Sequence, residues 1–218
     1  MGNHQLKWGV RLRRWVRFAR RIFRCPAVWR MIGHRPLPSL RSDLDLFEET
    51  MLSVTLIPFR GVDPDVVSHL VRDLNSLGFA ASVASPIEIP ERSYNPQRRQ
   101  YDAEAFLAAV REFPGARLLG IAKDDLFVEP LNFVFGLAER PGKAAVISLY
   151  RLQSDVDAKV YRQRIVKEAV HELGHTLGLN HCPQPDCVMH FSNSLRDTDR
   201  KDIYFCAACR RTAPAVRS

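Results

Sequence analysis

The sequence predicts an α+β protein, a mixed α/β domain in which helices pack against one twisted, mixed sheet. Two observations indicate this fold class. Short apolar, β-branched segments alternate with amphipathic helical segments from residue 51 to residue 152, an order that produces a sheet covered by helices. A long helical segment over 155–177 then precedes a short cysteine-rich part. At 218 residues, the chain fits one compact domain with an appendage.

The appendage is a basic arm. Residues 1–42 hold eleven lysines and arginines and no acidic residue, a charge of +11, whereas the remainder carries −3. Residues 6–24 place aromatic and aliphatic side chains at helical spacing among arginines, and a Pro-rich linker follows at 36–39. Such a helix is typical of contact with an anionic membrane surface or an acidic partner, while packing on the body, contact with nucleic acid and a role in organelle targeting stay open. The predicted division is 1–42 for arm and linker and 43–218 for the body.

The body reads as a β-α-β-α-β-β-β order that ends in the long helix. Asp63 is the expected N-cap of its first helix, and the polar stretch 90–100 is an expected long loop. Asp124 and Asp125 lie between strands, where we expect solvated carboxylates rather than a calcium site. The predicted strands are 51–59, 79–89, 117–122, 132–138 and 144–152, and the predicted helices are 64–77, 102–113, 155–177 and 197–205.

The long helix carries the most specific motif of the chain. Residues 171–181 form an H-E-x-x-H-x-x-G-x-x-H string. His171 and His175 are four residues apart, so they project from one face of the helix and their ring nitrogens reach one zinc ion. Glu172 lies between them, close enough to take a proton from a water at that metal. The apolar stripe of the same helix faces the core, which directs the histidines toward a cleft.

The third ligand has to come from beyond the end of this helix. Gly178 enters the left-handed conformation without steric cost, so the chain turns back under the metal. His181 then completes a three-histidine site with one open coordination position. Such an open site is catalytic, whereas a structural zinc site is saturated by protein ligands.

Four cysteines follow directly: Cys182, Cys187, Cys206 and Cys209. Two closely spaced thiolate pairs suit a second, structural zinc ion with tetrahedral coordination. Two disulfides are the alternative, and a reducing compartment argues against them because no secretory signal is evident. We therefore expect two zinc ions per chain, one catalytic and one structural, and a cytoplasmic location with peripheral membrane association through the arm.

The combined motif resembles the archaemetzincin family of zinc metalloproteases, within the metzincin clan. The resemblance covers residues 171–209, and the organisation upstream agrees with it. It implies a metzincin-like domain with an upper part at 43–180 and a C-terminal part at 181–211. It also implies that Glu172 is the general base, that Met189 lies in a Met-turn below the metal, and that an edge strand borders the cleft. Several metzincins place a tyrosine shortly after this Met, where His190 and Phe191 stand here, so the oxyanion partner is unassigned.

The function these residues predict is hydrolysis of peptide bonds in a peptide or protein substrate by metal-activated water. The alternative is a metzincin-like module that binds peptides or partners with little or no turnover. Nucleic-acid binding is disfavoured because few basic residues lie within the cysteine-rich part. The sequence does not decide the cleaved bond, endo- against aminopeptidase action, latency or the oligomeric state.

Overall fold

The computed structural model describes residues 51–154 and 156–213. The basic arm at 1–42, with its predicted helix and contacts, lies outside the described residues, so it and the domain boundary stay predictions. Within the described part of the chain, no helix is long and apolar enough to cross a membrane.

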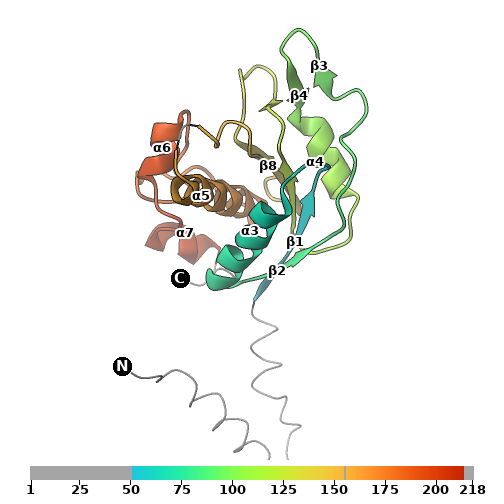
Figure 1. The fold of residues 1–218 in the computed structure, drawn as a ribbon. Helices are drawn as coiled ribbons and strands as arrows, with labels where there is room; N and C mark the ends of the chain where they lie inside the picture. Colours follow the sequence, from blue (N-terminus) through green and yellow to red (C-terminus); the bar gives the residue numbers. More distant parts are fainter. Residues whose placement is uncertain (1–50, 155, 214–218) are drawn as a thin grey trace, which may run out of the picture. The chain divides into compact units, whose positions relative to one another are not determined.

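A five-stranded sheet forms the centre of the fold (Figure 1). Its strand order is β2-β1-β5-β8-β7, with β7 at one edge and antiparallel to β8, while the other neighbours pair in parallel. The predicted mixed sheet with helices and a long helix is confirmed. The elements of this layer are β1 (Leu52–Pro58), α3 (Pro64–Ser76), β2 (Phe79–Val83), α4 (Ala103–Arg111), β5 (Leu118–Ala122), β7 (Gly136–Ala138), β8 (Ala144–Ser148) and α5 (Ala158–Thr176).

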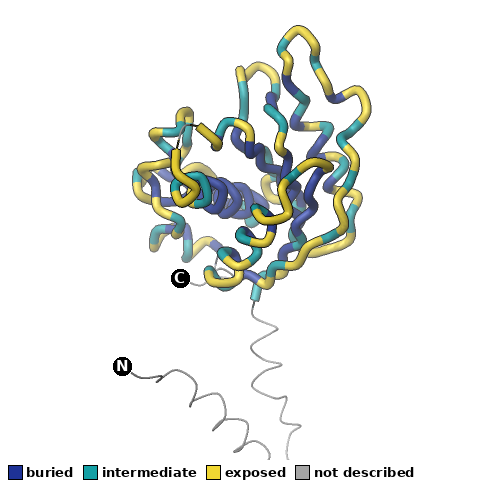
Figure 2. The backbone as a smooth tube through the Cα atoms, viewed as in Figure 1, coloured by how far each residue is buried: buried dark blue, intermediate teal, exposed yellow. Residues whose placement is uncertain are grey.

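Helices cover both faces of the sheet because its strands are apolar on both sides. All five residues of β5 and of β8 are buried. Leu119 and Ile121 of β5 belong to the core shared with α3 and α5, whereas Leu118 belongs to the core shared with Phe106 of α4. Figure 2 shows the central strands and α5 in the dark blue of buried residues. Helix α5 therefore lies between the sheet and the C-terminal part of the chain.

Aspartates cap the N-termini of α3, α4 and α5, as predicted for the first of them. The Asp63 carboxylate accepts a hydrogen bond from the Asp65 backbone N–H at 2.9 Å, which satisfies a donor left free at the helix start. Asp102 and Asp157 cap α4 and α5 in the same way. The long helix predicted at 155–177 is thus confirmed, with a start at Ala158.

Several predicted boundaries are wrong. The strand expected at 79–89 ends at Val83, since Pro86 has no N–H to donate and only Ile87 bridges back to the sheet. The strand expected at 132–138 is reduced to the three residues of β7. The helix expected at 197–205 is α6 (Leu195–Arg200), capped by the Ser194 hydroxyl, and α7 (Ala207–Thr212) follows where no helix was expected.

The predicted loop at 90–100 contains part of a second, small sheet. Strands β3 (Tyr94–Asn95), β4 (Gln100–Asp102) and β6 (Leu126–Phe127) are each two or three residues long, too short for periodicity to reveal them. This sheet supports the segment before β7. Arg98 donates to the Leu131 carbonyl at 2.7 Å, and the Gln100 amide donates to the Asn132 carbonyl at 3.0 Å.

The two adjacent aspartates of the predicted loop do not act as a pair. Asp125 accepts two hydrogen bonds of 2.7 Å from the Arg151 guanidinium. Burial raises the pKa of Asp124. The expectation of a solvated carboxylate is therefore wrong for Asp125, which Arg151 neutralises, and the absence of a calcium site stays a prediction.

The C-terminal segment, residues 182–213, supplies charged partners to α5. Arg164 of α5 forms two 2.7 Å hydrogen bonds with Asp199. Lys201 lies 3.1 Å from Glu168 of α5, and their side chains are 0% and 3% exposed. A buried ion needs such a partner, since water no longer solvates it.

Because this pair is buried, Lys201→Met is expected to leave the Glu168 carboxylate without a countercharge. The predicted loss of unfolding free energy is about 3–5 kcal/mol, measured by chemical denaturation. Adding Glu168→Gln should recover most of that loss. The control is Lys159→Met, an exposed lysine on α5, which should change stability by about 0.5 kcal/mol or less. A Lys201→Met protein as stable as the control contradicts the prediction.

Candidate active site

A cavity of about 540 Å³ lies between the edge strand β7 and α5. Most of residues 128–138 form one wall, and Glu168, His171, Glu172, His175 and His181 form the opposite wall together with residues 191–193. All three motif histidines and the motif glutamate are therefore brought to one cavity. The edge strand also borders it, as the resemblance implied.

The backbone fixes the orientation of two histidine rings. His171 Nδ1 donates to the Val188 carbonyl at 2.7 Å, and His175 Nδ1 donates to the Leu179 carbonyl at 2.8 Å. A carbonyl oxygen accepts only, so each Nδ1 carries the proton and each Nε2 presents a lone pair. The two Nε2 atoms face each other at 3.2 Å. Two unprotonated ring nitrogens this close inside a protein favour a shared cation, which at about 2.0–2.1 Å from each nitrogen would lie off the line that joins them.

The turn after α5 brings in the third histidine. Gly178 has φ +89°, and its N–H donates to the His175 carbonyl at 2.8 Å, so the predicted left-handed helix end is confirmed. The His181 ring lies 4.9 Å from that of His175 and 5.4 Å from that of His171, between ring centroids.

These three residues fit a zinc ion in size and in protonation state. One nitrogen from each histidine lies within 4.8 Å of the others. Tetrahedral coordination at about 2.0–2.1 Å would separate neighbouring nitrogens by about 3.3 Å, close to the 3.2 Å between His171 and His175. Burial lowers the pKa of His175 to about 4 and also lowers that of His181, and the Arg140 charge acts in the same direction on both. Neutral imidazole is the form that binds metal.

Glu172 lies in the same cavity, buried against the edge strand. Burial raises the pKa of its carboxyl to about 8, and the negative charge of Glu168 acts in the same direction. A Cβ atom at Gly136 would lie 2.5 Å from Glu172 Cγ and Oε1, closer than real Cβ contacts allow. The absence of a side chain at Gly136 therefore makes room for Glu172, a requirement that the sequence analysis missed.

Met189 and Phe191, which follow Cys187, pack against α5 and against His181. Met189 is fully buried. A Cβ at Gly174 of α5 would lie 2.4 Å from Met189 Sδ, so sulfur and helix backbone are in close contact between His171 and His175. Phe191 packs on His181 with ring centroids 4.9 Å apart.

The four cysteines form a second cluster. Their sulfur atoms lie within 4.8 Å of one another, with Cys182–Cys206 and Cys187–Cys209 each at 3.8 Å. All four thiols are free, and a disulfide would hold sulfur atoms about 2.05 Å apart. Tetrahedral zinc at about 2.3 Å would space sulfur atoms by about 3.8 Å. A hydrogen bond from the Cys209 backbone lowers the pKa of Cys206 to about 7, whereas burial raises the pKa of Cys187 and of Cys209.

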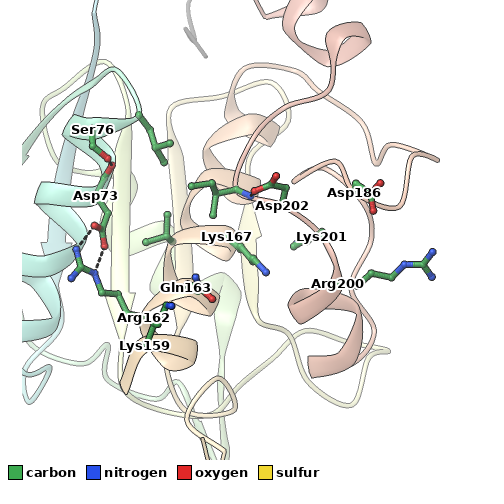
Figure 3. A pocket seen from close by; sticks show the side chains of 13 residues that line it. Asp73, Ser76, Lys159, Arg162, Gln163, Lys167, Asp186, Arg200, Lys201 and Asp202 are labelled. Atoms are coloured by element: carbon green, nitrogen blue, oxygen red, sulfur yellow. Dashed lines mark hydrogen bonds and ion pairs between the residues drawn. The ribbon is translucent and has the colours of Figure 1, made fainter. Parts of the chain in front are cut away.

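A second cavity of about 540 Å³ lies against a different face of α5 (Figure 3). It carries both signs of charge, and Arg162 in it is paired with Asp73. Lys167 also lines it, and its ammonium donates to the carbonyls of Thr198 and Asp199 at 3.0 and 2.9 Å. None of the predicted site residues lines this cavity.

The chain is similar to known metallopeptidases over most of its length. It matches the model of Peptidase family M54 over residues 54–213. An archaemetzincin of Methanopyrus kandleri is 49% identical over 124 residues, covering 56% of this chain and 70% of that protein. An archaemetzincin of Pyrococcus furiosus is 38% identical over 173 residues, covering 72% of this chain and 90% of that protein.

Solved structures give the same result. The crystal structure of the Methanopyrus kandleri archaemetzincin aligns with a TM-score of 0.69 at 38% identity, covering 76% of this chain and 94% of that one. A zinc-dependent peptidase from Methanocorpusculum labreanum aligns with a TM-score of 0.63 at 29% identity, covering 73% and 99%. From its motif, its fold and these relatives, the chain belongs to peptidase family M54, the archaemetzincin family of zinc metalloproteases.

Proposed function

We propose that the chain hydrolyses peptide bonds in the cavity beside α5, with a zinc ion held by His171, His175 and His181. The observation that carries this proposal is the pair of Nε2 lone pairs, 3.2 Å apart, in a cavity that also contains Glu172 and the third histidine. When bound, the zinc ion supplies Lewis acidity, which polarises the scissile carbonyl and acidifies the attacking water.

The protein residues orient the reactants and move the proton. The Glu172 carboxylate takes a proton from the attacking water and delivers it to the nitrogen of the departing amine. The backbone carbonyls of Val188 and Leu179 hold the ligand rings in place. An extended substrate pairs with β7, the strand at the edge of the sheet that borders the cavity. Met189 supports the floor below the ligands.

A second zinc ion, held by Cys182, Cys187, Cys206 and Cys209, is proposed to be structural. Four protein ligands leave no position for water, so this ion does no chemistry. It stabilises the C-terminal part of the proposed body at 43–218, a part with little apolar surface of its own.

Glu172→Gln tests the proposed base. The variant should keep its zinc content and fold, because the amide has nearly the same size, but it cannot accept the proton. We expect kcat for peptide hydrolysis to fall by about 10²–10⁴-fold. Glu112→Gln, at an exposed position, is the matched control and should leave kcat unchanged. Undiminished turnover in Glu172→Gln removes this residue from the mechanism. If the unmodified protein shows no chelator-sensitive hydrolysis, the chain is a peptide-binding module instead.

Gly136→Ala tests whether the edge strand makes room for that base. The added methyl should displace the Glu172 carboxylate, so kcat should fall about tenfold or more while zinc content is kept. The double variant Gly136→Ala/Glu172→Asp shortens the acid by one methylene. The loss of activation free energy in the double variant, calculated from kcat, should be smaller than the sum of the losses in the two single variants. A double-mutant cycle measures this difference. Purely additive losses contradict direct contact between the two positions.

Metal content tests the two proposed zinc sites. The unmodified full chain should contain two zinc ions by elemental analysis. His175→Ala should lose one of them and keep the other. Cys206→Ser/Cys209→Ser should lose the other and lower the melting temperature, since metal binding there is coupled to folding. A single zinc that disappears in both variants argues against two independent sites.

A further inference from the structure

We infer that Arg140 selects substrates by binding an anionic group of the peptide, a carboxylate, beside the histidine cluster. This inference rests on the proposed peptidase function and adds a specificity-determining residue to that site. Arg140 lines the same cavity as His175 and His181, and its side chain is exposed to solvent. It precedes Pro141 in the turn that joins β7 to β8.

The turn that carries Arg140 is held on two sides. The Glu139 carboxylate accepts the backbone N–H groups of Lys143 and Ala144, each at 3.0 Å. The Gly142 N–H donates to the carbonyl of Thr176, the last residue of α5, at 3.1 Å. The backbone of Arg140 is therefore held against the end of the helix that carries the histidines. Its side chain thus starts from a fixed position at the cavity wall.

Other charges in the cavity already have partners or are buried. Glu168 is paired with Lys201, and Glu172 is 5% exposed against the edge strand. Glu139, the neighbour of Arg140, binds Arg111 and two backbone N–H groups. Among the residues that the structure describes, Arg140 forms no ion pair. Of the described residues lining this cavity, it is thus the one exposed cation whose charge is not neutralised.

A free guanidinium at the wall of a peptide-binding cavity favours a carboxylate, which it binds through two parallel hydrogen bonds. Two parts of a peptide supply that group, an acidic side chain and the C-terminal carboxylate. Both groups are carboxylates that a guanidinium binds in the same way, and matched peptides that carry only one of them distinguish the two. Lysine in place of Arg140 would keep the positive charge but could not form the bidentate pair of hydrogen bonds.

Binding rather than turnover gives the primary test. The probe is a neutral peptide with a C-terminal amide, compared with peptides in which Glu replaces Gln at one position at a time, and with the free-acid form. Dissociation constants are measured for the zinc-loaded full chain carrying Glu172→Gln, which prevents cleavage. We expect at least one anionic peptide to bind about 10–100-fold more tightly than its neutral partner.

Adding Arg140→Gln should reduce that preference to about onefold, and Arg140→Lys should retain part of it. Arg72→Gln, an exposed arginine on α3 away from the cavity, should leave it unchanged. Preference for the free acid alone assigns the C-terminal carboxylate, and preference for Glu at one position assigns a side chain. Equal binding of anionic and neutral peptides, or a preference that survives Arg140→Gln, overturns the inference.

Kinetics of the unmodified protein then separate this inference from the proposed function. Substrate selection predicts that Arg140→Gln raises KM for the preferred anionic peptide about tenfold more than it raises KM for the matched neutral peptide. An equal fall of kcat on anionic and neutral peptides overturns selection in favour of a role in the reaction step. Absence of hydrolysis with all peptides contradicts the peptidase function, while the binding preference still decides the role of Arg140.

Discussion

The structure depends on the burial of a polar helix. Helix α5 places Arg164, Lys167, Glu168, His171 and Glu172 in the interior, each less than 9% exposed. An unpaired charge or polar group at such depth costs several kcal/mol. Every one of these groups therefore needs a partner, and most partners come from the C-terminal segment. Arg164 binds Asp199, Lys167 binds two backbone carbonyls, and Glu168 is paired with Lys201.

The C-terminal segment has two roles as a result. It covers the polar side of α5, and it contributes the Val188 carbonyl that orients the His171 ring. Its own helices α6 and α7 are six residues each, too short to be stable without tertiary support. The cluster of four cysteines joins both ends of this segment, so a metal ion there would hold the partners of α5 in place. In this way the proposed structural site, which begins at the residue after His181, would support the geometry of the proposed reactive one.

The cavity combines rigid and open features. On the α5 side, carbonyls fix two histidine rings, while Gly136 of β7 leaves the volume that Glu172 occupies. On the other side, the segment before β7 is held from outside by Arg98 and Gln100 of the small sheet. Ligand orientation is therefore set by backbone contacts and by packing, which is the support a metal-dependent site requires. Arg140 differs from all of these residues because its charge faces solvent and remains available to a ligand.

The sequence alone determined the fold class, the long helix and the local motif. Spacing of four on a helix places His171 beside His175 whatever surrounds them, and Gly178 permits a left-handed helix end at low cost. Tertiary structure alone decided what lies opposite that helix. The contact of Gly136 with Glu172 and the pairing of Glu168 with Lys201 join positions more than thirty residues apart. Hydrophobic periodicity in the sequence does not reveal contacts between such distant positions. The same holds for β3, β4 and β6, whose two or three residues form strands only because their neighbours in space supply the hydrogen bonds.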